Sequence, residues 1–269
     1  MIHIAAFAFL FLFAAAAQAQ SLKVADRQGA KTFTTQQLLA SPLARTVTIA
    51  HDASYGRTMT YRAIPMAELL KGLEVGPQNY VDFVASDKFS IGVPTRLLLP
   101  GTHKPQAFLA IEEPAAPWPE LPDHGRGTAA PFYIVWQDAP PHEISPEYWT
   151  YKLAALEVGD SPYKRWPSLE VAADLPATHP ARRGLDRYVA LCISCHRFKG
   201  AGGGEQGPDL GQPMNPVDYF QPAALRTFLR SSKAVRDWPD RKMPSFSEDA
   251  MSDTDMEAII AWLTYQARR

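Results

Sequence analysis

Short apolar runs of strand length dominate the chain from residue 21 to about residue 168. β-Branched and aromatic residues gather in these runs, as in buried strands. One short helix fits among them, because Pro65 stands at its start and Gly72 at its stop. We therefore expect an α+β, sheet-centred domain over residues 20–168. Its predicted strands are residues 46–50, 80–84, 131–136 and 153–158.

From Gly184 onward the spacing of apolar residues changes to that of amphipathic helices. Residues 184–191 and 222–230 form two such stretches. A third follows Ser252, a favoured N-cap residue, and Asp255 stands in the capping-box position. This pattern predicts an all-α domain over residues 184–269. The apolar stripe of the third helix is Met256, Ile259, Ile260 and Leu263.

Between these two regions, residues 169–183 contain Pro176 and Pro180 and show no strong periodicity. Proline stiffens a chain without hydrogen bonds, so this segment is predicted to be a semi-rigid linker. The chain is thus expected to be multidomain, with the sheet-centred domain first and the helical domain second.

The N-terminus begins with an unbroken apolar run of 14 residues, from Ile4 to Ala17. A spanning helix needs roughly 20 such residues, and a small-x-small cleavage pattern ends at Ala19. Residues 1–19 are therefore predicted to be a signal peptide, cleaved near Ala19, which places the mature protein in the periplasm. Because no Lys or Arg precedes the run, an uncleaved anchor stays open. No later segment is apolar enough to span a membrane.

Charge and cysteine content narrow the function. The 27 Lys and Arg residues against 28 Asp and Glu give a net charge of −1, whereas nucleic-acid binders normally carry a basic face. No nucleic-acid partner is therefore expected. The chain has only two cysteines, which excludes a disulfide framework and a four-thiolate metal cluster.

The two cysteines lie in the sequence Cys192-Ile193-Ser194-Cys195-His196. C-x-x-C-H is the pattern of covalent haem attachment, in which both thiols add to the porphyrin and the histidine binds the iron. A thioredoxin-like pair would follow a strand, and a zinc site would need further ligands. One motif predicts one covalent haem c, held by Cys192 and Cys195, with His196 as an axial iron ligand.

Two further motifs follow: Gly207-Pro208-Asp209-Leu210 and Lys242-Met243-Pro244. Together with C-x-x-C-H and the terminal helix, they make the last 85 or so residues resemble a class I cytochrome c domain. The resemblance implies that Met243 is the second axial ligand and that the Pro208 carbonyl accepts a hydrogen bond from His196. Met214 is the main competitor of Met243. Trp238 is expected either to bond a haem propionate or to pack on the haem edge.

The front half resembles the molybdopterin-binding domain of sulfite-oxidase-type enzymes, through residues 62–70, 80–90 and 132–136. Enzymes of that family bind molybdenum through a cysteine thiolate. Haem attachment uses both cysteines of this chain, so no molybdopterin is expected and the activity of the family is not carried over.

Other groups in the front half give no clear site. His51, with Asp52 after it, offers the start of a metal or anion site, but four histidines lie in loop-like stretches: His51, His103, His124 and His142. No spacing supports a pair of catalytic carboxylates, and no Gly-rich phosphate loop follows a strand.

These observations predict a periplasmic monohaem c-type cytochrome that transfers single electrons. Its front domain is expected to dock a redox partner protein, either a dehydrogenase or another electron carrier. Two alternatives remain. In the first, the front domain is the catalytic part of an oxidoreductase and passes electrons to the haem. In the second, it is a module that binds a metal or small ligand.

Overall fold

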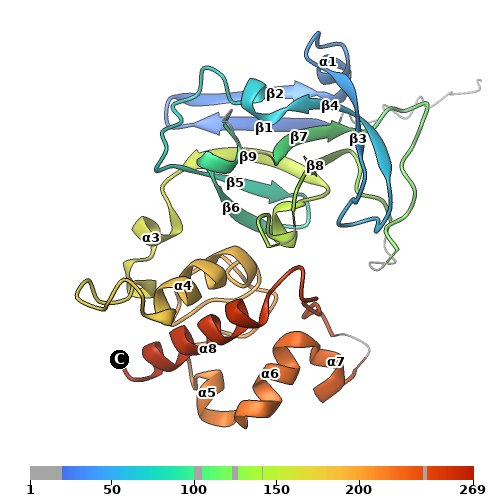
Figure 1. The fold of residues 1–269 in the computed structure, drawn as a ribbon. Helices are drawn as coiled ribbons and strands as arrows, with labels where there is room; N and C mark the ends of the chain where they lie inside the picture. The colour runs from blue at the N-terminus through green and yellow to red at the C-terminus, as the bar shows by residue number, and fades with distance from the viewer. Residues whose placement is uncertain (1–19, 100–104, 123–126, 141, 239–240) are drawn as a thin grey trace, which may run out of the picture.

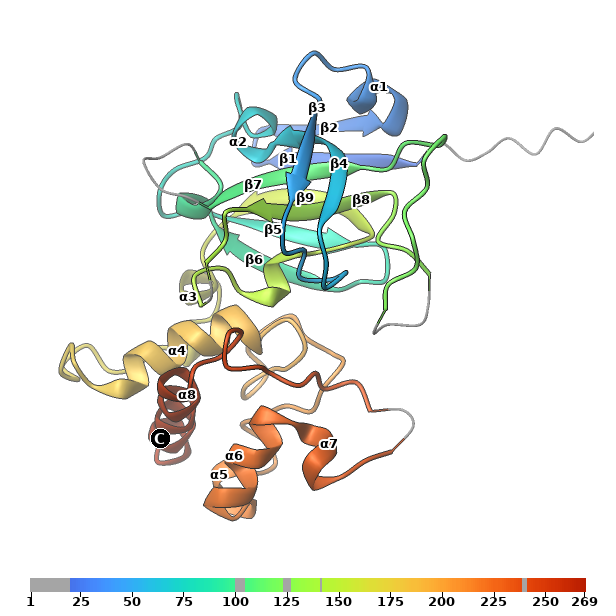
Figure 2. The ribbon, with the colours of Figure 1, turned by 45° about the vertical axis from the view of Figure 1, so that its right-hand side comes forward.

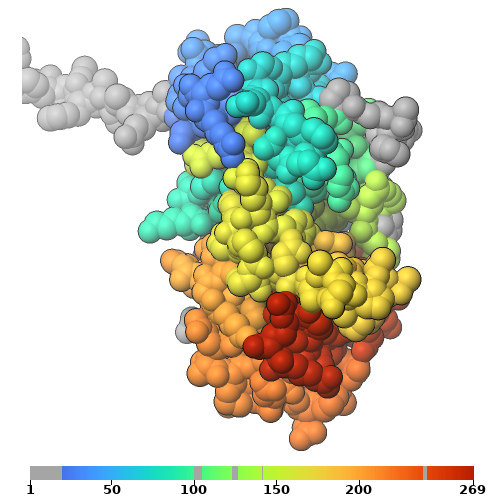
Figure 3. All heavy atoms as spheres, turned by 90° about the vertical axis from the view of Figure 1, so that its left-hand side faces the viewer, coloured from blue at the N-terminus to red at the C-terminus, as the bar shows by residue number. Residues whose placement is uncertain are grey.

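The computed structural model describes residues 20–99, 105–122, 127–140, 142–238 and 241–269. A sheet-rich N-terminal region is followed by a group of helices, which confirms the predicted fold class (Figure 1). We name the region from β1 to β9 the sheet domain and the region from α4 to α8 the helical domain. Figure 3 shows the two packed directly against each other. The predicted signal peptide, His103 and His124 lie outside the described residues.

The described strands form two sheets, ordered β2-β1-β9-β5-β6 and β3-β4-β7-β8. All neighbours are antiparallel except β1 and β9, which are parallel. The strands are β1 (Ser21–Asp26), β2 (Gly29–Thr34), β3 (Arg45–Ile49), β4 (Met59–Pro65), β5 (Tyr80–Ala85), β6 (Ser90–Pro94), β7 (Gln106–Ile111), β8 (Phe132–Gln137) and β9 (Leu153–Gly159).

The four predicted strands correspond to β3, β5, β8 and β9. In β8 every residue from Phe132 to Trp136 is buried, although this strand ends its sheet. The segment before β9 covers it, because the Ile134 amide donates to the Thr150 carbonyl (3.0 Å) and Trp136 Nε1 to the Tyr148 carbonyl (3.1 Å). The remaining strands were not predicted. β1, for example, buries only Leu22 and Val24, too short an alternation to stand out.

The helices divide between the two domains. Those of the sheet domain and the segment after it are α1 (Thr35–Leu39), α2 (Met66–Leu69) and α3 (Pro162–Arg165), with the 3₁₀ turns η1 (Thr95–Leu97), η2 (Pro146–Tyr148) and η3 (Pro167–Leu169). Those of the helical domain are α4 (Pro180–Leu191), α5 (Pro216–Tyr219), α6 (Pro222–Arg230), α7 (Ser232–Val235) and α8 (Asp253–Ala267).

Helices α4 and α8 cross closely and form the core of the helical domain (Figure 2). The crossing requires glycine at Gly184, because a Cβ there would lie 1.9 Å from the Ala258 carbonyl oxygen. One turn later, the rings of Tyr188 and Trp262 stack with their centroids 4.4 Å apart. The close packing fixes α4, whose C-terminal end leads into the haem-attachment motif.

The segment 169–183, predicted as a linker, is packed against α8. Leu169 is fully buried, and its carbonyl accepts hydrogen bonds from Trp262 Nε1 (3.2 Å) and Gln266 Nε2 (2.9 Å). Helix α4 begins at Pro180, one turn before the predicted Gly184, because His179 caps it and proline suits a first helical position.

The start of α8 agrees with the sequence only in part. The Ser252 hydroxyl accepts the Asp255 amide (3.1 Å), as an N-cap should. The Asp255 carboxylate does not complete a capping box. Instead it is buried and paired with Arg183 (2.7 Å) and Arg187 (3.3 Å) of α4. The carboxylate of Asp255, which the sequence pattern placed in a capping box, instead forms ion pairs between α4 and α8.

Candidate haem-attachment site

The two cysteines lie on one tight turn at the end of α4. The amides of Cys195 (3.1 Å) and His196 (2.8 Å) both donate to the Cys192 carbonyl. Both thiols are partly buried and not joined in a disulfide. Burial, followed by the charge of Glu147, raises the pKa of Cys192 to about 12 and that of Cys195 to about 11. The turn therefore presents two protonated thiols side by side.

His196 is held by one ring nitrogen. Its Nδ1 lies 2.8 Å from the Pro208 carbonyl oxygen, and a carbonyl can only accept a hydrogen bond. Burial lowers the pKa of His196, an effect that the bond to Pro208 opposes. The neutral ring thus carries its proton on Nδ1 and keeps the Nε2 lone pair for a ligand.

Glycines allow the loop after the motif to approach the histidine. A Cβ on Gly207 would lie 2.3 to 2.8 Å from three atoms of the His196 ring. The Gly207 amide donates to the Cys195 carbonyl (2.8 Å). Asp209 closes the loop, accepting backbone amides from Lys199 (2.8 Å) and Gly200 (2.7 Å). Burial alone would raise the pKa of Asp209, but these hydrogen bonds lower it overall.

The residues present fit a covalently attached haem. Two thiols that form no disulfide lie on one turn beside His196. The Pro208 carbonyl fixes the tautomer of this histidine and leaves its Nε2 to bind a metal. The structure brings Cys192, Cys195 and His196 of the motif together with Pro208, the residue that the family resemblance implied.

Met243 lies in the extended stretch between α7 and α8, with its side chain partly buried against the core. Its carbonyl accepts two hydrogen bonds, from Ser232 Oγ (3.1 Å) and Arg241 Nη1 (3.0 Å). Among the described contacts, no hydrogen bond joins Met243 to the His196 group. The two carbonyl contacts fix the backbone at the predicted ligand.

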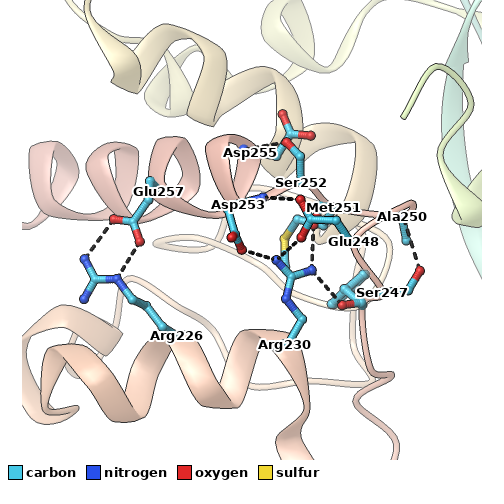
Figure 4. Close-up of polar contacts among 11 residues, drawn as sticks. Arg226, Arg230, Ser247, Glu248, Ala250, Met251, Ser252, Asp253, Asp255 and Glu257 are labelled. Atoms are coloured by element: carbon cyan, nitrogen blue, oxygen red, sulfur yellow. Dashed lines mark hydrogen bonds and ion pairs between the residues drawn. The ribbon is translucent and has the colours of Figure 1, made fainter. Parts of the chain in front are cut away.

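The stretch after Met243 is held by Arg230 of α6 (Figure 4). Its Nη1 donates to the carbonyls of Phe246 (2.9 Å) and Met251 (2.6 Å), and its Nη2 to Asp253 (2.7 Å). The neighbouring Arg226 pairs with Glu257 of α8 at the surface. One arginine thus anchors the connection from Met243 to α8.

The alternative methionines have different surroundings. Met251 and Met256 are buried in the core, whereas Met214 is 51% exposed. Trp238 is exposed as well. Met243 remains our prediction for the second ligand.

In the sheet domain, His51 and His142 are exposed, whereas Asp52 is buried. Its Oδ1 accepts from the amides of Ser54 (3.0 Å) and Tyr55 (2.9 Å) and from the Tyr133 hydroxyl (3.0 Å). Its Oδ2 accepts from the Tyr61 hydroxyl (2.8 Å). The described residues contain no cluster of three or more His, Cys, Asp or Glu that could hold a metal.

Sequence reasoning missed Ser232, Arg230 and Arg241. Each acts on a backbone carbonyl, so no side-chain motif marks it. Glu147 was missed too, because it reaches the haem-attachment turn from the other domain.

Residues 181–266 match the family model described as Cytochrome c. This part of the chain is a cytochrome c domain. Members of this family transfer electrons, so the match supports an electron-transfer role and haem c.

Among solved structures, the chain is similar to the sulfane dehydrogenase SoxCD from Paracoccus pantotrophus, with 16% identity and a TM-score of 0.36. The match covers 52% of this chain and 38% of that one. No curated protein matches the chain. Among the described residues, no helix is long and apolar enough to cross a membrane.

Proposed function

We propose that this protein is a periplasmic monohaem cytochrome that transfers single electrons. The hydrogen bond between His196 Nδ1 and the Pro208 carbonyl (2.8 Å) carries the proposal. It leaves Nε2 as the metal-binding atom beside two unbridged thiols. When bound, haem c supplies a one-electron couple at its iron.

The chain's own residues have separate tasks. Cys192 and Cys195 would hold the haem covalently, and His196, oriented by its hydrogen bond to Pro208, would bind the iron. Met243 would supply a second protein ligand, a thioether, which would raise the reduction potential relative to a second histidine. Ser232 and Arg241 keep the Met243 backbone in place through its carbonyl. Two protein ligands would fill the coordination of the iron, which would suit electron transfer.

The test is spectroscopic. The protein, expressed with a signal peptide in a host that attaches haem c, should retain one haem after denaturation, detected by mass and by haem staining. The ferric form should show the weak far-red band of an iron–methionine bond. Met243→Ala should remove that band. A band that survives would make Met214 or another group the ligand.

We further propose that the sheet domain docks a redox partner, a dehydrogenase or another electron carrier. Its buried carboxylate, Asp52, is occupied by hydrogen bonds within the domain, which favours a structural role for this group over a catalytic one. Metal analysis of the purified holoprotein should give iron alone. Molybdenum or another metal in stoichiometric amount would instead support an enzyme whose sheet domain passes electrons to the haem.

A further inference from the structure

A segment of the sheet domain lies on the haem-attachment turn. It connects β8 to β9 and points toward the end of α4 (Figure 2). The buried Ser145 hydroxyl donates to the Ala190 carbonyl (2.6 Å), one of the carbonyls that the end of α4 leaves without a helical partner. The His142 amide donates to the Asp249 carbonyl (3.0 Å). The contact between the domains is therefore specific and polar.

This segment carries one acid to the turn. Glu147 is partly buried, and its Oε2 accepts a hydrogen bond from Ser194 (3.3 Å), which stands between the two cysteines. Among the described residues, Glu147 has no ion-pair partner. A carboxylate in such a place keeps most of its field, because neither a neighbouring cation nor bulk water screens it well.

The position of Glu147 at this turn also changes its acidity. Burial raises the pKa of Glu147 to about 7. Its hydrogen bond to Ser194 holds the carboxylate of the sheet domain on the turn that carries both attachment atoms.

We propose that Glu147 tunes the haem electrostatically across the domain interface and lowers its reduction potential. The inference rests on the proposed function. A nearby negative charge stabilises the ferric state, which carries one more positive charge than the ferrous state. The sheet domain then sets a property of the electron carrier in addition to covering part of its surface.

The experiment is a redox titration of the full-length holoprotein in alkaline buffer, where the carboxyl group is ionised. Glu147→Gln should shift the midpoint potential to more positive values. Glu147→Asp, which keeps the charge, should stay close to the wild type. Glu143→Gln is the matched control, because Glu143 lies in the same segment but is exposed, and it should leave the potential unchanged.

The outcomes separate the two proposals. Wild-type protein without covalent haem would overturn the proposed function, and this inference with it. Holoprotein whose potential is the same in Glu147→Gln and wild type would overturn the inference alone. If Glu147→Gln does not fold, Glu147→Met, neutral and of similar length, takes its place. Loss of folding in both neutral variants would make Glu147 a structural residue and equally overturn the inference.

Discussion

The two domains hold a buried carboxylate and a partly buried histidine in different ways. In the sheet domain, Asp52 accepts four hydrogen bonds, from Ser54, Tyr55, Tyr61 and Tyr133, which use both of its oxygens. In the cytochrome c domain, His196 is bonded through one ring nitrogen and keeps the other for a ligand. A buried group whose bonds are all made within the fold stabilises it, whereas one held on a single side is prepared to bind something else.

Removal of the attachment atoms should have the largest effect. Cys192→Ala combined with Cys195→Ala removes both covalent bonds, so all haem should be lost on denaturation. Haem staining of a denaturing gel and the intact mass measure this. Asp52→Asn, the corresponding change in the sheet domain, should keep the full haem content. Haem loss in that variant would mean that haem attachment depends on the sheet domain.

Removal of the Asp52 carboxyl group should have the next largest effect, a loss of stability of the sheet domain. Asp52→Ala leaves the Tyr61 hydroxyl and two backbone amides without their acceptor and the Tyr133 hydroxyl with Ser54 alone, which should lower the free energy of unfolding by about 3 kcal/mol or more. In Asp52→Asn, Oδ1 still accepts three bonds and Nδ2 faces the Tyr61 oxygen, so the loss should be smaller. Urea denaturation followed by tryptophan fluorescence compares them, and equal losses would contradict the network.

The wild type and Asp52→Asn also give a pH test. Burial raises the pKa of Asp52, an effect that its hydrogen bonds only partly offset. The folded state therefore binds the proton more tightly than the unfolded chain, and this stabilisation is fully present below the ordinary pKa of 3.8. It should be lost as the pH rises through the folded pKa. The unfolding free energy of the wild type minus that of Asp52→Asn should fall as the pH rises through this range. A difference that does not change with pH would contradict the raised pKa.

A smaller effect is expected at the histidine loop. Gly207→Ala places a Cβ against the His196 ring, which should cost about 2 kcal/mol and loosen the bond to Pro208. The thermal midpoint of the holoprotein and its Soret spectrum report this change. Gly203→Ala is the matched control, since a Cβ at that position would meet nothing within 4 Å beyond its chain neighbours. Similar losses in both variants would point to a general effect of the loop.

The smallest expected effect is a difference in stability between substitutions of two arginines of α6. Arg230→Ala removes bonds to the carbonyls of Phe246 and Met251, and should cost about 1 kcal/mol, because the side chain is partly exposed and water replaces some of the bonds. Arg226→Ala removes a surface ion pair with Glu257 and an exposed hydrogen bond to the Pro222 carbonyl of its own helix, and should change little. Denaturant midpoints compare the two, and the reverse order would show that the anchor is not Arg230.

The sequence predicted most where one residue type has one role. The C-x-x-C-H motif predicts haem attachment because its residues are neighbours in the sequence, the family resemblance implied the contact of Pro208 with His196, and the cap at Ser252 predicted the start of α8. Short strands such as β1 were missed because two apolar residues make too weak a pattern. Arg230, Ser232 and Glu147 were missed because each acts on a group distant in the sequence, a relation that only the folded chain contains.

The Leu169 carbonyl also indicates where the chain can be divided. It accepts hydrogen bonds from Trp262 and Gln266, close to the C-terminus, so residues that precede the cytochrome c match by 12 positions belong to its folding unit. A gene fragment for the electron carrier alone has to begin before Leu169. One that starts at the first residue of α4 would leave the Trp262 indole and the Gln266 amide, both in the second half of the terminal helix, without this acceptor.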